Sequence, residues 1–291
     1  AQASILNLYD PDRSAAVLNN GAAADAGGAI AALQALAQNP SARIAFVVGA
    51  EESPTLDRLR SAVAQKFAAS TWFGYRPEGS SEALAGVRSV TGRSARVVNQ
   101  MSNAEVILSL DADFLGSTNP SLVLDAGGFA AKRRVESTAD DMSRLYVVES
   151  QYSVTGSMAD HRMRMKASAV GMFAGAVARA LGMSGFDVSG LDETTLNRAA
   201  LIAADLQAAG SNALVVAGDT QPAAVHALAL AMNEQLGSVG TTVNLVETTE
   251  SFASASTQEL TQLASDLSAG RYSALVMLGV NPVYDLPDSV G

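Results

Sequence analysis

Two aspartates with the spacing of a functional pair, Asp111 and Asp113, follow the apolar run from Glu105 to Leu110. In an extended strand, side chains two residues apart point to the same face, so these carboxylates could bind a metal ion or exchange a proton with a substrate. The neighbouring sequence offers no third metal ligand. We therefore expect the two aspartates to cap the end of the strand and the loop that follows it.

A second pair that could do chemistry is Asp160 with His161, one of only two histidines in the chain. Adjacent residues in a loop rarely converge on one proton or one metal ion. The sequence contains no Cys, no H-E-x-x-H and no G-x-S-x-G, which disfavours a nucleophile or a zinc site at His161. The other histidine, His226, lies one position off the apolar stripe of its helix, which indicates a core boundary. No catalytic residue and no metal ligand is predicted.

The loops that follow buried strands form the ligand cleft of an open α/β sheet. In this sequence those loops are rich in acids, which repel a diphosphate, and in prolines, which lack the N–H donor that would bind it. Neither G-x-G-x-x-G nor G-x-x-x-x-G-K-[ST] occurs. We therefore predict a cleft without a cofactor. The residues expected around it are Asp111, Asp113, Glu149, Ser150, Asp160, His161, Gly218, Asp219, Gln221, Gly279 and Asn281.

The elements that position these residues are predicted from the spacing of apolar side chains. Short apolar runs rich in β-branched residues alternate with segments of helical spacing, which is typical of an α/β fold with mostly parallel sheets. The predicted strands are 44–48, 105–110, 145–149, 213–216, 242–246 and 274–278. A Gly-, Ser- and Asp-rich stretch from Gly182 to Asp192 interrupts the pattern. We therefore predict two doubly wound units, residues 1–185 and residues 186–291, the second truncated at its C-terminal end.

Helix ends are marked by capping residues. A capping side chain precedes a proline at Ser53-Pro54, Asn119-Pro120 and Asn281-Pro282, and Ser256 with Glu259 matches a capping box. Left-handed helix ends are expected at Gly182, Gly210, Gly237 and Gly270. These marks agree with the apolar periodicity.

Composition excludes several classes of function. The 291 residues are 48% hydrophobic, enough for a full core, and no run approaches the roughly 18 apolar residues of a membrane span. The net charge of −10 repels nucleic acid. The absence of Cys excludes disulfides, zinc knuckles and thiolate-bound iron–sulfur clusters. The chain lacks an initiator Met and stops soon after a strand, so we interpret it as an excised piece.

Seven runs, in order over essentially the whole chain, carry a resemblance to a known family. They are 8–13, 106–116, 144–150, 155–162, 217–222, 226–228 together with 231–233, and 278–285. These runs resemble the B subunit of alternative complex III. The resemblance implies units similar to the domains of molybdopterin oxidoreductases of the formate dehydrogenase and DMSO reductase type, with the molybdenum cofactor absent and the cleft degenerate and empty. Iron–sulfur clusters would belong to a Cys-rich part downstream.

The resemblance also implies a function, that of a non-catalytic structural domain in a respiratory, quinol-oxidising electron-transfer complex. The partners would be other subunits of a membrane-bound complex, including cytochrome c subunits and a quinol-binding membrane subunit, at the periplasmic face of the inner membrane. Neither nucleic acid nor a membrane span is expected. Two alternatives stay open. One is a catalytic subunit that binds molybdopterin guanine dinucleotide, with Ser or Asp ligating the metal. The other is a small-molecule binding module at the cleft between the units.

Overall fold

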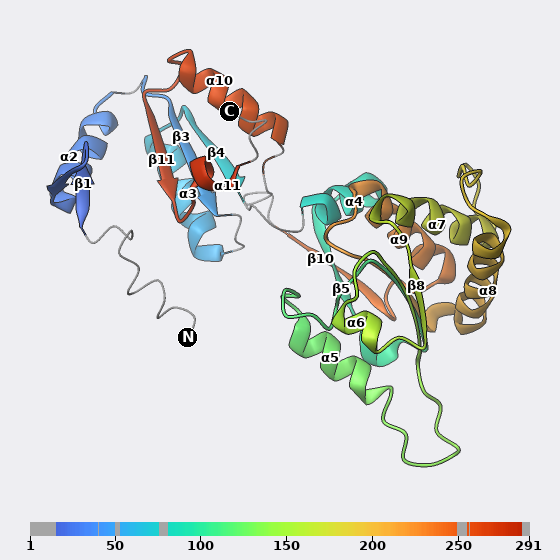
Figure 1. Ribbon diagram of the computed structural model, residues 1–291. Helices are drawn as coiled ribbons and strands as arrows, with labels where there is room; N and C mark the ends of the chain where they lie inside the picture. Colours follow the sequence, from blue (N-terminus) through green and yellow to red (C-terminus); the bar gives the residue numbers. More distant parts are fainter. Residues whose placement is uncertain are drawn as a thin grey trace. The chain divides into compact units, whose positions relative to one another are not determined.

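The computed structural model describes residues 16–39, 41–49, 53–75, 81–248, 255 and 257–286 (Figure 1). The fold is α/β with mostly parallel sheets, as the sequence predicts. The chain forms two compact units. Unit 1 consists of Ala1–Tyr75 with Ala255–Gly291, and unit 2 consists of Arg76–Ser254. In the described part of the chain, no helix combines the length and the apolar character that crossing a membrane requires.

This division differs from the predicted boundary between residues 185 and 186. The glycine-rich stretch connects α7 (Ala167–Ala180) to α8 (Glu193–Ala209), and the two helices pack against each other within unit 2. Gly182 and Gly185 have φ angles of +91° and +96°, which turn the chain between the helices. The glycines therefore mark a helix connection, and the chain instead leaves unit 1 after Tyr75 and returns to it later.

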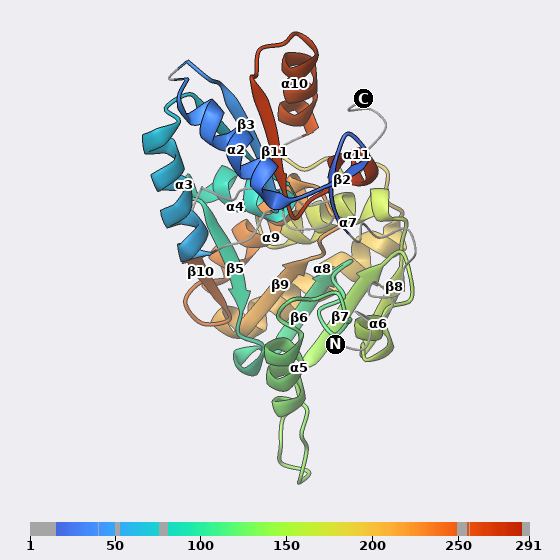
Figure 2. The ribbon, with the colours of Figure 1, turned by 90° about the vertical axis from the view of Figure 1, so that its left-hand side faces the viewer.

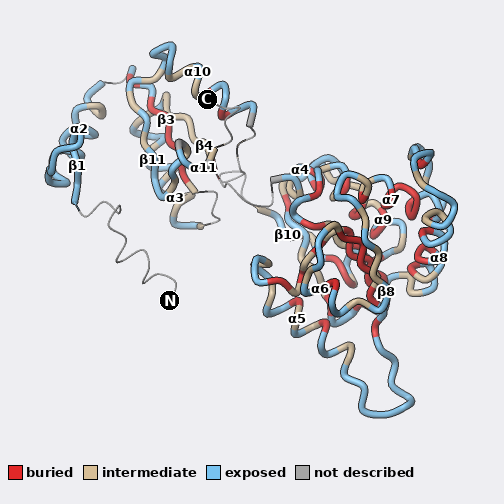
Figure 3. Tube along the Cα trace, in the orientation of Figure 1, coloured by how far each residue is buried: buried red, intermediate tan, exposed pale blue. Residues whose placement is uncertain are grey.

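Unit 2 is built on a parallel four-stranded sheet in the order β8-β7-β6-β9. The strands are β6 (Val106–Leu110), β7 (Arg144–Glu149), β8 (His161–Arg164) and β9 (Ala213–Ala217). Leu108 of β6 lies opposite Tyr146 of β7 and Val215 of β9. β6 is buried along its whole length, because helices enclose a central parallel strand from both faces. Figure 3 shows the buried stretches of unit 2 gathered between its helices.

Helices cover both faces of this sheet. α7, α8 and α9 (Ala223–Leu236) pack on one face, where Phe173 is fully buried. α5 (Leu122–Ala131) covers the other face, where Phe129 meets Phe114 edge-on with ring centroids 5.6 Å apart. Figures 1 and 2 show the sheet between α5 on one side and α8 on the other. All the carboxyl ends of the parallel strands therefore meet at one edge of an enclosed sheet.

Unit 2 also contains an antiparallel pair, β5 (Ala95–Asn99) with β10 (Val243–Glu247). β10 confirms the strand predicted at 242–246, whereas the sequence does not predict β5. α4 (Ser81–Thr91) packs on α9 at Gly86, where a Cβ atom would lie 2.7 Å from the backbone oxygen of Ala223. Shorter elements are α6 (Val154–Ser157) and the 3-10 turns Met101–Asn103 and Gly210–Asn212.

Unit 1 holds a parallel three-stranded sheet in the order β11-β3-β4. The strands are β3 (Ile44–Gly49), β4 (Ser70–Tyr75) and β11 (Ala274–Leu278). The other elements are the hairpin of β1 (Val17–Asn19) and β2 (Ala22–Ala24), and the helices α2 (Ala26–Ala37), α3 (Pro54–Lys66), α10 (Thr257–Ser268) and α11 (Pro282–Asp285). Leu260 and Leu263 of α10 form a core with Val47. Phe46 stacks on Trp72 with ring centroids 4.2 Å apart.

Several predicted helix ends are confirmed. The Ser53 side chain accepts a hydrogen bond from the Leu56 N–H at the start of α3. Positive φ angles occur at Gly182, Gly210, Gly237 and Gly270. α5 begins two residues after the predicted Pro120, because the Asn119 side chain is used within the preceding turn. The capping box predicted at Ser256 lies outside the described residues.

Candidate functional site

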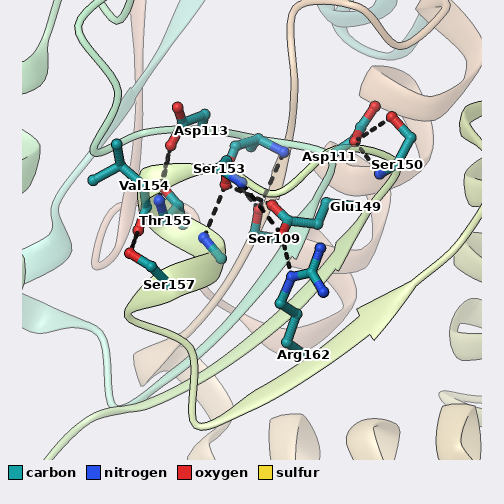
Figure 4. Close-up of polar contacts among 12 residues, drawn as sticks. Ser109, Asp111, Asp113, Glu149, Ser150, Ser153, Val154, Thr155, Ser157 and Arg162 are labelled. Atoms are coloured by element: carbon teal, nitrogen blue, oxygen red, sulfur yellow. Dashed lines mark hydrogen bonds and ion pairs between the residues drawn. The ribbon is translucent and has the colours of Figure 1, made fainter.

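Asp111 lies where β6 ends, and it joins three loops of unit 2. Its carboxylate accepts hydrogen bonds from the Ser150 N–H at 2.9 Å (Figure 4), from Thr220 Oγ1 at 3.2 Å and from Gln221 Nε2 at 3.0 Å. Ser150 follows β7, and the other two donors follow β9. One carboxylate therefore ties together the carboxyl-end loops of three parallel strands.

The backbone around Asp111 is arranged for close approach. Asp111 has a φ of +59°, in the left-handed region that Asp adopts more readily than most residues. The Gly218 N–H donates to the backbone oxygen of Leu110 at 2.9 Å. A Cβ atom at Gly218 would lie 2.0 Å from the backbone oxygen of Asp111. Glycine at position 218, which has no Cβ atom, therefore allows the chain after β9 to lie close to the chain after β6.

Asp113 bonds to a different loop. Its carboxylate accepts from the Thr155 N–H at 2.9 Å and from Thr155 Oγ1 at 2.8 Å, and the Leu115 N–H donates to the same hydroxyl at 2.9 Å. In Figure 4, Asp111 points toward Ser150 whereas Asp113 points toward Thr155. The two aspartates therefore hold separate loops and do not form a pair directed at one ligand.

Glu149 is a buried carboxylate, 2% exposed, at the end of β7. It is ion-paired with Arg162 of β8 and accepts a 2.5 Å hydrogen bond from Ser153 Oγ (Figure 4). The Arg162 guanidinium also lies 4.5 Å from the centre of the Tyr152 ring. The sequence reasoning missed this ion pair. The only signal for it is the alternation of Arg and Met from 162 to 165, which marks a strand with one polar side.

Asp160 and His161 lie at the opposite end of the sheet. Asp160 receives a bidentate pair from Arg133 at 2.7 and 2.8 Å, together with the Leu145 N–H at 2.8 Å. The hydrogen bond from Arg133 lowers the pKa of Asp160. His161 stacks on Tyr146 with ring centroids 4.9 Å apart. Leu145 and Tyr146 begin β7, so Asp160 and His161 do not share a cleft with Asp111.

Three of the polar residues considered in the sequence, Asp219, Gln221 and His226, lie at the start of α9. Gln221 is 1% exposed, and its Oε1 atom has no hydrogen-bond partner within the described ranges, whereas Asp219 is exposed. Burial lowers the pKa of His226, and the negative charge of Asp219 acts in the opposite direction. His226 is therefore mainly neutral near pH 7.

The residues predicted around the cleft are separated further, because two of them belong to unit 1. Gly279, with a φ of +66°, and Asn281 both follow β11. The predicted residues therefore lie at three places: the carboxyl ends of β6, β7 and β9, the amino ends of β7 and β8, and the end of β11. Among the described residues, no group of three or more His, Asp or Glu side chains is arranged to hold a metal ion.

No protein-family model matches this sequence, and no curated protein matches it. A solved structure with similarity to the chain is the formyltransferase/hydrolase complex FhcABCD from Methylorubrum extorquens, determined in complex with methylofuran. The TM-score is 0.48 and the identity is 16%. The similarity covers 76% of this chain and 57% of that one, so this chain spans little more than half of the length of its neighbour.

These comparisons correct the resemblance drawn from the sequence. Assignment to the B subunit of alternative complex III is wrong: no family model and no curated protein matches the sequence, and the similar solved structure is a formyltransferase/hydrolase complex. Two of the runs, 106–116 and 144–150, are parallel strands with the loops that follow them, and such a pattern belongs to a fold class rather than to one family. The run 8–13 lies outside the described residues.

Proposed function

We propose that this chain is a non-catalytic structural module of a larger protein assembly. The observation that supports it is that Asp111, Asp113 and Glu149, the acids at the strand exits of unit 2, are all engaged by donors of the chain itself. A general acid or base must reach the proton of a substrate, and a metal ligand needs a lone pair directed at the metal. Here the lone pairs hold loops in place.

A catalytic subunit with a molybdopterin guanine dinucleotide is the alternative from the enzyme class. Its diphosphate needs cations or free N–H donors. Arg162 is a cation at these strand exits, and it is paired with the buried Glu149. Recruiting Arg162 to a ligand would leave Glu149 buried without its partner, which costs about 3 to 5 kcal/mol. The internal ion pair therefore opposes diphosphate binding.

Thermal unfolding with pyrophosphate, GMP and GDP tests the proposal. A ligand at about 100 times its Kd stabilises a protein by about 2.7 kcal/mol, so a working site raises the Tm measurably. We expect no rise with any of the three compounds. A reproducible rise, or stoichiometric molybdenum in the full-length protein, would overturn the proposal in favour of a catalytic subunit or a small-molecule binding module.

The partners that we propose are other protein subunits. Large apolar side chains are exposed at Val123 and Leu124 on α5 and at Tyr152 beside α6, and an assembly would cover them. A respiratory setting with cytochrome c subunits, a quinol-binding membrane subunit, a periplasmic location and molybdopterin-oxidoreductase-like domains stays a prediction. Co-purification with haem proteins would support that setting, and an assembly without haem would contradict it.

A further inference from the structure

β11 forms one edge of the sheet of unit 1, and its outer side is unpaired among the described residues. The Ser273 N–H donates to the backbone oxygen of Arg43, toward β3, at 2.8 Å. The oxygens of Ala45 and Val47, two and four residues beyond Arg43, also face β11, and in the parallel register they lie within reach of the N–H groups of Val276 and Leu278. The N–H and C=O groups of Leu275 and Met277 therefore point outward, away from the sheet.

The side chains of β11 do not prevent another strand from pairing with this edge. All five are apolar, and Leu275 and Met277 are 38% and 46% exposed. Proteins usually protect a free edge with charges, with proline or with a covering element. β11 has neither a charge nor a proline.

The other edges of the two parallel sheets are protected within the described residues. On β9, the Asn233 side chain accepts from the Val215 N–H at 2.9 Å and donates to the Val215 oxygen at 2.8 Å. On β4, the Ala255 N–H donates to the oxygen of Gly74 at 2.7 Å. On β8, the Met165 N–H faces β7, so the outward positions are 162 and 164, and both are arginines. Among the edges of the parallel sheets, β11 is thus the one that resembles an interface.

We propose that β11 pairs with β11 of a second copy of this chain, antiparallel, across a two-fold axis at Val276. This register places Leu275 opposite Met277 as a hydrogen-bonded pair in both directions, with Val276 opposite Val276 between them. The outward N–H and C=O groups of Leu275 and Met277 then meet partners in the other copy, as in an antiparallel ladder. The apolar side chains of Leu275 and Met277 cover each other. The two sheets join into one continuous sheet.

Self-complementarity favours a second copy over a different partner strand. A two-fold interface requires one surface to match itself. The uncharged β11 meets this condition, because no like charges face each other in the register. β8 does not meet it, since Arg162 would lie opposite Arg164. The dimer is independent of the non-catalytic role proposed above, and either can fail without the other.

Disulfide trapping tests the register directly, because the chain has no Cys of its own. In Val276→Cys the two introduced thiols share a non-hydrogen-bonded pair with Cα atoms about 4.5 Å apart, within disulfide range. Ala274→Cys is the matched control, since its two copies lie four residues apart, more than about 13 Å. Under mild oxidation we expect a covalent dimer for Val276→Cys and monomer for Ala274→Cys. Equal trapping of both, or of neither, would overturn the register.

A charge on the edge tests the dimer itself. Met277→Lys places a lysine in the strand without altering the backbone, and Leu59→Lys makes the same change at a similarly exposed position on α3, 45% exposed. Light scattering over a wide concentration series should show a monomer–dimer equilibrium for the wild type and for Leu59→Lys. Met277→Lys should weaken it at least tenfold while circular dichroism stays unchanged. A wild type that is monomeric throughout the series, or a dimer insensitive to Met277→Lys, would refute the proposal.

Discussion

The two units stabilise their parallel sheets with different kinds of interaction. In the described part of the chain, every buried polar or charged side chain lies in unit 2, where such groups include Glu149, Gln221 and Asn233. Unit 1 has none, and neither α2 nor β11 contains a buried residue. Unit 2 is therefore specified by directional bonds between loops and strands. Unit 1 relies on apolar contacts, and it leaves an apolar strand open.

This difference shows where each unit is sensitive to change. A buried polar group that loses its partner retains its full desolvation cost, so the network of unit 2 tolerates few substitutions. An exposed apolar side chain contributes little to its own unit, and its contribution appears when another surface covers it. Stability measurements should therefore be most sensitive in unit 2, and association measurements in unit 1.

The largest difference is expected between two leucines on strands. Leu108 of β6 is fully buried, and Leu108→Ala should lower the free energy of unfolding by about 2 to 5 kcal/mol. Leu275→Ala on the exposed edge should cost less than about 1 kcal/mol in the monomer. Urea unfolding at a concentration where the protein is monomeric measures both. Equal losses would break the distinction between the units.

The next largest effect is expected at Asn233, whose side chain occupies the edge of β9. Asn233→Ala leaves the buried N–H and C=O of Val215 without partners, and each such group costs about 1 to 3 kcal/mol. Hydrogen exchange at Val215 should accelerate together with the loss of stability. Asn244→Ala, at an exposed position of β10, is the control and should change stability by less than about 0.5 kcal/mol. Slow exchange at Val215 in the variant would contradict the role of Asn233.

Sequence reasoning located the strands that are rich in apolar and β-branched residues. β3, β6, β7, β9 and β11 are apolar runs, and their bounds match the expectation to within a residue. β4 and β5 were out of reach, because Ser70, Gly74, Arg96 and Asn99 interrupt the pattern that reveals a buried strand. The division into units was also out of reach, since β11 pairs with β3 from the far end of the chain.

The candidate site could be predicted only in part. The acids Asp111 and Asp113 do follow β6, since that placement depends on local sequence alone. Their partners Thr155 and Gln221 come from loops that only the folded sheet brings together. The same limit applies to the pairing of Asp160 with Arg133. Periodicity gives no information on such long-range contacts.

The contribution of the Asp160–Arg133 ion pair to the stability of unit 2 can be measured as a function of pH. Because Arg133 lowers the pKa of folded Asp160 below the unfolded value of about 3.9, the ion pair stabilises the protein fully above that value. The stability is lost as the pH falls through the folded pKa. Asp160→Asn should therefore cost about 1 to 2 kcal/mol near pH 7 and progressively less toward pH 3. Asp141→Asn, at an exposed loop position, is the control. A cost for Asp160→Asn that does not change with pH would contradict the ion-pair account.

The smallest change in stability is expected from Arg164→Val, which removes a charge from the β8 edge of unit 2. Arg164 is exposed, so its loss should change the free energy of unfolding by less than about 0.5 kcal/mol. If charge is what keeps this edge free, the variant should associate at lower concentration than the wild type, even when Met277→Lys closes β11 in the same chain. Light scattering of the double variant against Met277→Lys alone isolates the β8 edge. Arg162 stays paired with Glu149 in this variant, so the increase in association measures the contribution of the Arg164 charge alone. An unchanged monomer would mean that the short β8 strand, rather than its charge, protects unit 2.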